Sequence, residues 1–118
     1  MHIKGFKIGQ YNIGSDNSPF IIAELSANHN GNLERALSIV QSAAKAGVHA
    51  LKLQTYTADT MTLNVGLPQF IIEDRDSLWS GRTLYNLYEE AHTPWDWHKH
   101  IFEMAEELVL VCFSTPVD

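Results

Sequence analysis

The sequence predicts an α/β fold, namely the N-terminal portion of a (β/α)8 TIM barrel with about three parallel strands, preceded by a β-hairpin. Predicted strands at 20–26, 50–55 and 109–115 alternate with segments of helical periodicity. Repeated strand–helix units are typical of doubly wound sheets and of (β/α)8 barrels. A complete barrel needs about 250 residues, and the chain has 118. We therefore expect one incomplete barrel domain over 1–118.

The domain is expected to divide into a hairpin with its loop at 1–19 and the first βα units at 20–118. Apolar and polar residues alternate at 6–8 and 11–13, which is typical of strands. The Gly9-Gln10 pair between them suits a tight hairpin turn. The run at 20–26 has few polar residues, as expected for a strand that is covered on both faces.

A strand–helix–strand unit follows. Asn32 is suited to cap a helix whose apolar residues recur every three or four positions from Leu33 onward. Gly47 is suited to end this helix, and the strand at 50–55 comes directly after it. This order predicts parallel pairing of the two strands and a right-handed crossover between them.

The segment at 57–80 has little periodicity and is long for a connection, so it is expected to be a functional loop or lid. A short helix is predicted around 84–91. A second helix is expected to start at Thr93-Pro94, with Thr93 as its cap and Pro94 at its first position. The last predicted strand covers 109–115.

Composition excludes several classes of protein. The formal charge is −6 and the eight basic residues do not cluster, so a nucleic-acid surface is not expected. No apolar run approaches the roughly 18 residues of a membrane span, and the single cysteine, Cys112, excludes a disulfide framework. No secretory signal is visible. A cytoplasmic location is the resulting expectation.

Polar residues mark the ends of the predicted strands, where (β/α)8 barrels place function. Strand parity puts Lys52 and Gln54 on one face and the neighbouring leucines on the other. If the leucines face the helices, Lys52 points into the barrel, where an unpaired ammonium is costly. Lys52 is then expected to pair with an anionic ligand, to form an internal ion pair with Glu24, or to be exposed on an irregular strand.

Asn28-His29-Asn30-Gly31 comes directly before a predicted helix. These side chains could orient a ligand or bind an anion, although spacing alone favours a turn with a cap. The other ring and thiol side chains are expected to be structural. His92 would lie at a helix end, and His98 and His100 on the surface. The tryptophans Trp79, Trp95 and Trp97 would pack against other side chains, and Cys112 would lie in the core.

Three blocks of residues resemble the sialic acid synthase family. They fall in the family's order and near its intervals: Phe20–Glu24 with Asn28–Gly31, Lys52–Tyr56, and Phe113–Pro116. The segments Asp59–Leu63 and Glu89–Trp95 are more similar to the pseudaminic acid synthase branch. The resemblance covers the whole chain but only about the N-terminal third of a family member.

The resemblance implies an enzyme that joins phosphoenolpyruvate to the open-chain aldehyde of an acetamido sugar and releases phosphate. Lys52 would bind phosphoenolpyruvate, with Ser114 and Thr115 donating hydrogen bonds nearby. Glu24 and Gln54 would contact the sugar, Glu24 and Lys52 being the catalytic pair. Asn28 and His29 would shape the adjacent substrate-binding loop.

A divalent metal, manganese or magnesium, would polarise the aldehyde, with ligands expected beyond Asp118 and none from this chain. The parent protein would be a homodimer. The isolated chain is expected to be inactive and to self-associate through unpaired strand edges. N-acetylneuraminate or legionaminate synthesis is the alternative activity, and a non-catalytic truncated remnant is the alternative of another class.

Overall fold

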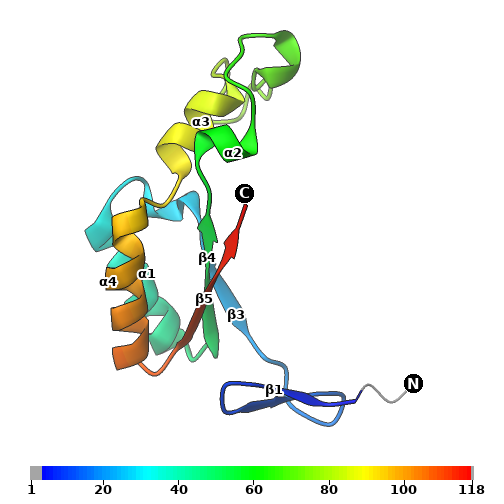
Figure 1. Cartoon of the computed structure of the whole chain (residues 1–118), viewed down its shortest axis with the longest axis vertical. Coiled ribbons are helices and arrows are strands. Elements are labelled where there is room, and N and C mark those ends of the chain that lie inside the picture. Colours follow the sequence, from blue (N-terminus) through cyan, green and yellow to red (C-terminus); the bar gives the residue numbers. More distant parts are fainter. Residues whose placement is uncertain (1–3, 118) are drawn as a thin grey trace.

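The structure, a computed structural model, describes residues 4–117 (Figure 1). The ends of the expected domain, residues 1 and 118, lie outside this range. The elements, in chain order, are β1 (Phe6–Ile8), β2 (Tyr11–Ile13), β3 (Ile22–Leu25), the 3-10 turn η1 (Ala27–His29), α1 (Leu33–Ala46), β4 (Ala50–Thr55), α2 (Ala58–Met61), the 3-10 turn η2 (Pro68–Phe70), α3 (Leu84–Ala91), α4 (Trp95–Glu107) and β5 (Val111–Pro116).

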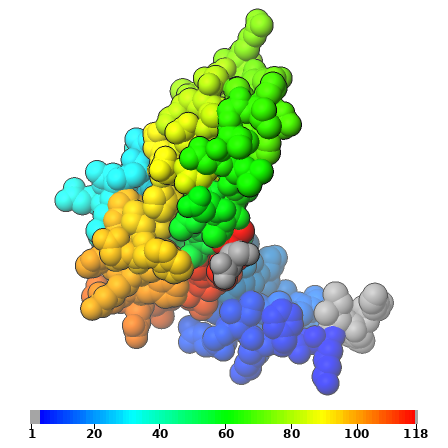
Figure 2. Space-filling view, turned by 45° about the horizontal axis from the view of Figure 1, so that its top comes forward, coloured from blue at the N-terminus to red at the C-terminus, as the bar shows by residue number. Residues whose placement is uncertain are grey.

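The centre of the molecule is a parallel sheet with the strand order β3-β4-β5. Helices α1 and α4 lie side by side on one face of this sheet (Figure 1). The antiparallel hairpin β1-β2 lies beyond the amino ends of the strands, and α2 and α3 lie beyond their carboxyl ends. Figure 2 shows the hairpin projecting from the body of the molecule. The predicted α/β fold, with three parallel strands after a hairpin, is confirmed.

The core lies between the sheet and the two helices. Leu25, Leu51 and Leu53 of the strands are fully buried there, against Val40 of α1 and Ile101 of α4. Full burial of each such side chain stabilises the fold by roughly 1.5–3 kcal/mol. The opposite face of the sheet carries no helix in the part of the chain that the structure describes.

The expectation that the strand at 20–26 is covered on both faces is wrong for the described residues. Ile22 is 45% exposed on the face that bears no helix, and β3 itself is shorter than predicted. Its neighbour β4 has the predicted bounds, because Leu51 and Leu53 alternate with Lys52 and Gln54 on a regular strand.

The ends of α1 follow the predicted chemistry. The Asn32 side chain accepts a hydrogen bond from the Arg35 N–H at 2.8 Å, which satisfies one of the free donors of the first turn. At the other end Gly47 adopts φ +83°, a left-handed conformation that glycine adopts without steric cost. Both end signals of this helix are confirmed.

The expected start of α4 is wrong by one residue. Pro94 is the N-cap residue and the helix begins at Trp95. Thr93 caps nothing, because it is buried and its hydroxyl is hydrogen-bonded to His29. Tertiary packing outweighs the local capping preference at this position.

The expected start of the third parallel strand is two residues too early. Val109 has φ +58°, and the Leu110 N–H is hydrogen-bonded to the Ala105 carbonyl, so both residues close the end of α4. β5 therefore starts at Val111. The segment at 57–80 contains α2, η2 and a β-bridge from Ile71 to Thr83; its role as a lid stays a prediction.

Between residues 4 and 117, the helices are all too short or too polar to cross a bilayer.

Candidate functional site

The candidate site lies on the uncovered face of the sheet, toward the carboxyl ends of β3 and β4. The Glu24 carboxylate of β3 is its centre. Glu24 Oε1 accepts a hydrogen bond from Gln54 Nε2 at 2.7 Å and lies 3.8 Å from Lys52 Nζ. The side chains of Lys52 and Glu24 are 31% and 45% exposed. A cation, an anion and an amide thus share one solvent-accessible surface.

The sheet register explains why these three side chains meet. Glu24 is the direct register partner of Lys52, and Gln54 follows Lys52 on the same face of β4. The intervening leucines fill the core on the other face, as predicted. Of the alternatives for Lys52, the ion pair with Glu24 is present, and binding of an anionic ligand by Lys52 stays a prediction.

Thr115 belongs to the same face, because its register partner is Gln54. Ser114 lies on the opposite face, as the partner of Leu53. Two residues that are adjacent in sequence are therefore separated by the sheet. Strand alternation would have shown this from sequence, once the register of β5 was known.

A polar group that sequence reasoning missed connects the strand ends to α4. Thr55 Oγ1 lies 2.5 Å from Ser114 Oγ and 2.7 Å from His98 Nε2. His98 is half-buried, so its expected place on the surface is wrong. The signal was available in the sequence, since parity puts the Thr55 hydroxyl on the helix-covered face, where a polar group needs a partner.

The loop at 28–31 is a tight turn held by its own side chains. Asn28 Oδ1 accepts from the Ser26 N–H at 3.0 Å. His29 is fully buried; its Nδ1 accepts from the Gly31 N–H at 3.0 Å, and its Nε2 lies 3.1 Å from Thr93 Oγ1. The contacts of Asn28 and His29 are thus with the protein itself, and their role in shaping a substrate loop stays a prediction.

Burial lowers the pKa of His29 from its ordinary value of 6.5, and the nearby His92 lowers it further. The backbone N–H that donates to Nδ1 requires Nε2 to carry the ring hydrogen, so His29 donates to Thr93. The indole of Trp97 packs edge-on against the ring, at 5.1 Å between centroids. A neutral His29 therefore fixes the loop to the start of α4.

The remaining ring and thiol side chains are mostly where they were expected. His92 ends α3, His100 is exposed, and burial raises the pKa of Cys112 to about 11, so its thiol stays protonated. Trp97 is partly buried and packs against the core. Trp95 does not, since it is 69% exposed, and its expected packing role is wrong for the described chain.

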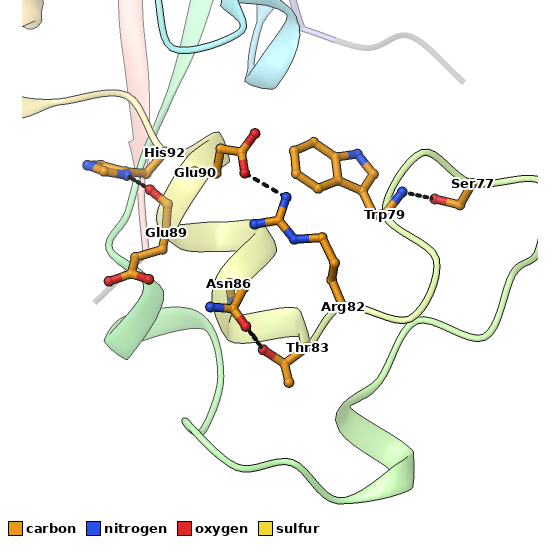
Figure 3. Close-up of polar contacts among 8 residues, drawn as sticks. All are labelled: Ser77, Trp79, Arg82, Thr83, Asn86, Glu89, Glu90 and His92. Atoms are coloured by element: carbon orange, nitrogen blue, oxygen red, sulfur yellow. Dashed lines mark hydrogen bonds and ion pairs between the residues drawn. The ribbon is translucent and has the colours of Figure 1, made fainter.

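Trp79 packs against the segment that precedes α3 (Figure 3). The Arg82 guanidinium lies 5.1 Å from the centre of its ring and forms an ion pair with Glu90 at 2.6 Å. This contact attaches the segment before α3 to the helix. It is remote from Glu24 in the fold, because α3 lies beyond the strand ends (Figure 1).

A metal site would need several acidic, histidine or cysteine side chains close together. Between residues 4 and 117, no group of three or more such side chains is placed to hold a metal ion. Glu24 is the single carboxylate of the cluster with Lys52 and Gln54, and it is already bonded to both. The described residues therefore do not fit a divalent metal at this site.

Comparisons with known proteins give the chain its family. Residues 39–118 match the family model described as "NeuB family". The chain is 52% identical over 110 residues to the pseudaminic acid synthase of Campylobacter jejuni, covering 93% of this chain and 31% of that protein. It is 46% identical over 98 residues to the pseudaminic acid synthase of Helicobacter pylori, covering 83% and 28%.

A solved structure gives the same result. The N-acetylneuraminic acid (sialic acid) synthetase of Leptospira borgpetersenii, in complex with citrate, superposes with a TM-score of 0.74 at 27% identity, over 98% of this chain and 35% of that one. The chain spans about a third of the length of the relatives it matches. The order of the motifs, the sheet and these similarities agree, and the chain belongs to the NeuB family.

Proposed function

We propose that the protein containing this chain is a phosphoenolpyruvate-dependent synthase that makes pseudaminic acid from an acetamido-deoxy-hexose. The chain would be the first part of its (β/α)8 barrel, with the open face of the sheet toward the barrel interior. The observation that carries the proposal is the accessible cluster of Glu24, Lys52 and Gln54 at the strand ends. The identity of 46–52% to pseudaminic acid synthases supports the choice of product.

Each member of the cluster has a role in this reaction. The Lys52 ammonium holds the anionic groups of phosphoenolpyruvate through charge-assisted hydrogen bonds, and the Thr115 hydroxyl donates from the same face. The Glu24 carboxylate accepts hydrogen bonds from sugar hydroxyl or acetamide N–H groups. Gln54 already holds Glu24 at 2.7 Å, so it orients the carboxylate and adds an amide contact.

The chemistry forms one carbon–carbon bond. Carbon three of phosphoenolpyruvate attacks the aldehyde carbon, and the aldehyde oxygen takes up a proton. Water adds at carbon two and gives up one proton, which gives a tetrahedral intermediate. Phosphate then leaves that carbon with the electron pair of the C–O bond, and the hydroxyl on carbon two gives its remaining proton to the phosphate as the ketone forms. The cluster contributes by holding both substrates in one orientation, which removes much of the entropic barrier to their reaction.

A divalent metal, manganese or magnesium, would supply Lewis-acid polarisation of the aldehyde in the proposed whole enzyme. Its ligands are expected beyond Asp118, as the family resemblance implies. No step assigned to this chain depends on it. A cytoplasmic homodimer is the proposed form of the whole protein, on the strength of the family resemblance.

N-acetylneuraminate synthesis is the second candidate. It is supported by the similarity of the whole chain to the Leptospira structure, at a TM-score of 0.74. The cluster described above suits several acetamido sugars, because a carboxylate and an amide recognise hydroxyl and acetamide groups in more than one stereochemistry.

The test is an assay of phosphate release by the complete protein, with phosphoenolpyruvate and each of three hexoses. We expect turnover with the acetamido-deoxy-hexose precursor of pseudaminic acid and little with N-acetylmannosamine or the legionaminate precursor. Turnover with N-acetylmannosamine alone would replace the first candidate by the second. The isolated chain of 118 residues is expected to release no phosphate with any of them, and measurable release by that chain would contradict the proposal that its barrel is incomplete.

A further inference from the structure

The polar chain formed by His98, Thr55 and Ser114 lies behind the candidate site, on the helix-covered face of the sheet. It joins three elements, α4, β4 and β5, at the level where the strands end. His98 Nδ1 also lies 3.2 Å from the Pro94 carbonyl oxygen. Each of the three side chains comes from a different element, so the polar chain connects the ends of β4 and β5 and fixes them to α4.

The direction of each hydrogen bond in this polar chain follows from the contact with the Pro94 carbonyl oxygen. A carbonyl oxygen only accepts, so His98 Nδ1 carries the ring hydrogen and donates to Pro94. In the neutral imidazole Nε2 is then an acceptor, and the Thr55 hydroxyl donates to it. The Thr55 oxygen in turn accepts from Ser114. One ring tautomer thus determines both hydroxyl orientations.

The residues next to Thr55 and Ser114 in the sequence belong to the candidate site. Gln54 precedes Thr55 on β4, and Thr115 follows Ser114 on β5. Gln54 and Thr115 are register partners on the opposite, open face. The hydrogen bond between Thr55 and Ser114 on one face therefore connects β4 and β5 at the point where Gln54 and Thr115 lie on the other face.

We propose that His98 is a positioning residue for the substrate face, acting through Thr55 and Ser114 to hold Gln54 and Thr115 in place. This inference rests on the proposed function for its kinetic part only. It also assigns Ser114 a new role: its hydroxyl hydrogen is committed to Thr55 on the far side of the sheet from Lys52, so Ser114 supports the strand end and does not donate to phosphoenolpyruvate.

The first test uses kinetics of the complete protein. His98→Leu is expected to lower kcat/KM by about 10- to 100-fold, the cost of misplacing substrate contacts, at temperatures where the variant is fully folded. His98→Gln places an amide oxygen near the position of Nε2 and is expected to restore most of the loss. His100→Leu, an exposed position on the same helix, is the matched control and should match the parent protein.

A double variant tests the route of the effect. If His98 acts through Thr55, combining His98→Leu with Thr55→Val costs little more than either change alone. Fully additive losses in kcat/KM would overturn the proposal. So would a His98→Leu variant that melts earlier but keeps the kinetic constants of the parent while folded.

The second test needs no substrate, so it separates this inference from the proposed function. Nitrogen-15 NMR of the complete protein should show His98 as a neutral ring protonated at Nδ1. His98→Leu should shift the backbone amide resonances of Gln54 and Thr115, whereas His100→Leu should not. A ring protonated at Nε2, or unchanged Gln54 and Thr115 resonances, would overturn the inference even if the enzyme made pseudaminic acid.

Discussion

The two faces of the parallel sheet differ in nearly every respect. The covered face is packed with fully buried leucines under α1 and α4, and its few polar groups are all bonded to one another or to backbone. The open face carries Glu24, Lys52 and Gln54, which are bonded to one another and still accessible. Parity along β4 produces the contrast, since Leu51 and Leu53 alternate with Lys52 and Gln54.

This difference separates stability from chemistry. Apolar burial on one face supplies the free energy of folding, so the other face is free to hold charged groups that contribute little to it. Changes on the covered face are then expected to unfold the protein, and changes on the open face to impair binding. The four predictions below test that separation, from the largest expected effect to the smallest.

Leu53→Ala on the covered face is expected to have the largest effect on stability. The side chain is fully buried between β4 and the helices, and its truncation leaves a cavity, so the free energy of unfolding should fall by about 2–5 kcal/mol. Chemical denaturation of the chain measures it. Ile22→Ala, on the open face and 45% exposed, is the matched control, and equal losses for both variants would contradict the separation.

Lys52→Met on the open face should impair catalysis instead. If the contact with phosphoenolpyruvate contributes about 2–4 kcal/mol, kcat/KM of the complete protein falls by about 30- to 1,000-fold. The KM for phosphoenolpyruvate should rise more than that for the sugar. The melting temperature of the isolated chain should hardly change, since the pair is exposed there and at 3.8 Å contributes about 0–1 kcal/mol.

Glu24→Gln is the counterpart variant and should raise the KM for the sugar more than that for phosphoenolpyruvate. If Lys52 were only the ion-pair partner of Glu24, Lys52→Met would lower the melting temperature and leave the affinity for phosphoenolpyruvate unchanged. That pattern would remove Lys52 from the ligand site.

The open face should also make the isolated chain associate with itself. Ile22 and the neighbouring Ile21 are 45% and 48% exposed, and β3 has an unpaired edge within the described residues. Such edges pair with other chains. Sedimentation velocity at rising concentration should show species larger than a monomer, and Ile22→Lys should reduce them. A stable monomer at high concentration would contradict this prediction.

The smallest predicted effect is a pH dependence of the free energy of unfolding that comes from the buried His29 ring. The folded protein lowers the pKa of His29 below its unfolded value of about 6.5 by burying the ring. The stability that depends on neutral His29 is therefore complete above that value and is lost as the pH falls below it. Urea midpoints between about pH 7.5 and pH 5 should show this loss. His29→Gln should reduce the slope, whereas His100→Gln should leave it unchanged.

Local patterns in the sequence were sufficient to predict the sheet and its charged face. The cap at Asn32, the stop at Gly47 and the alternation from Leu51 to Gln54 are local signals, and each depends only on backbone geometry and side-chain parity. The meeting of Glu24 with Lys52 followed from parallel pairing. The family motif then connected this face with an enzyme.

Contacts between distant elements were the part that local patterns did not predict. Thr93 has a good capping sequence, yet it turns inward because His29, 64 residues away, needs a partner for its ring N–H. The helical pattern predicts His98 on the surface, but its hydrogen-bond partner, Thr55, lies on a strand 43 residues earlier. The family resemblance gives Ser114 and Thr115 one role, whereas the register of β5 puts their side chains on opposite faces of the sheet.

The long segment between β4 and β5 can change in length with little effect on the stability of the sheet. Ala50 pairs with Ile22 on one side and with Val111 on the other, so the second pairing closes a loop about twice as long as the first. Because the entropy of loop closure grows only with the logarithm of length, the extra cost is about 0.6 kcal/mol. The chain therefore tolerates α2, η2 and α3 between these strands at almost no thermodynamic cost. Insertions or deletions at the exposed Leu63 or Leu78 should alter how fast β5 joins the sheet far more than how stably it stays there.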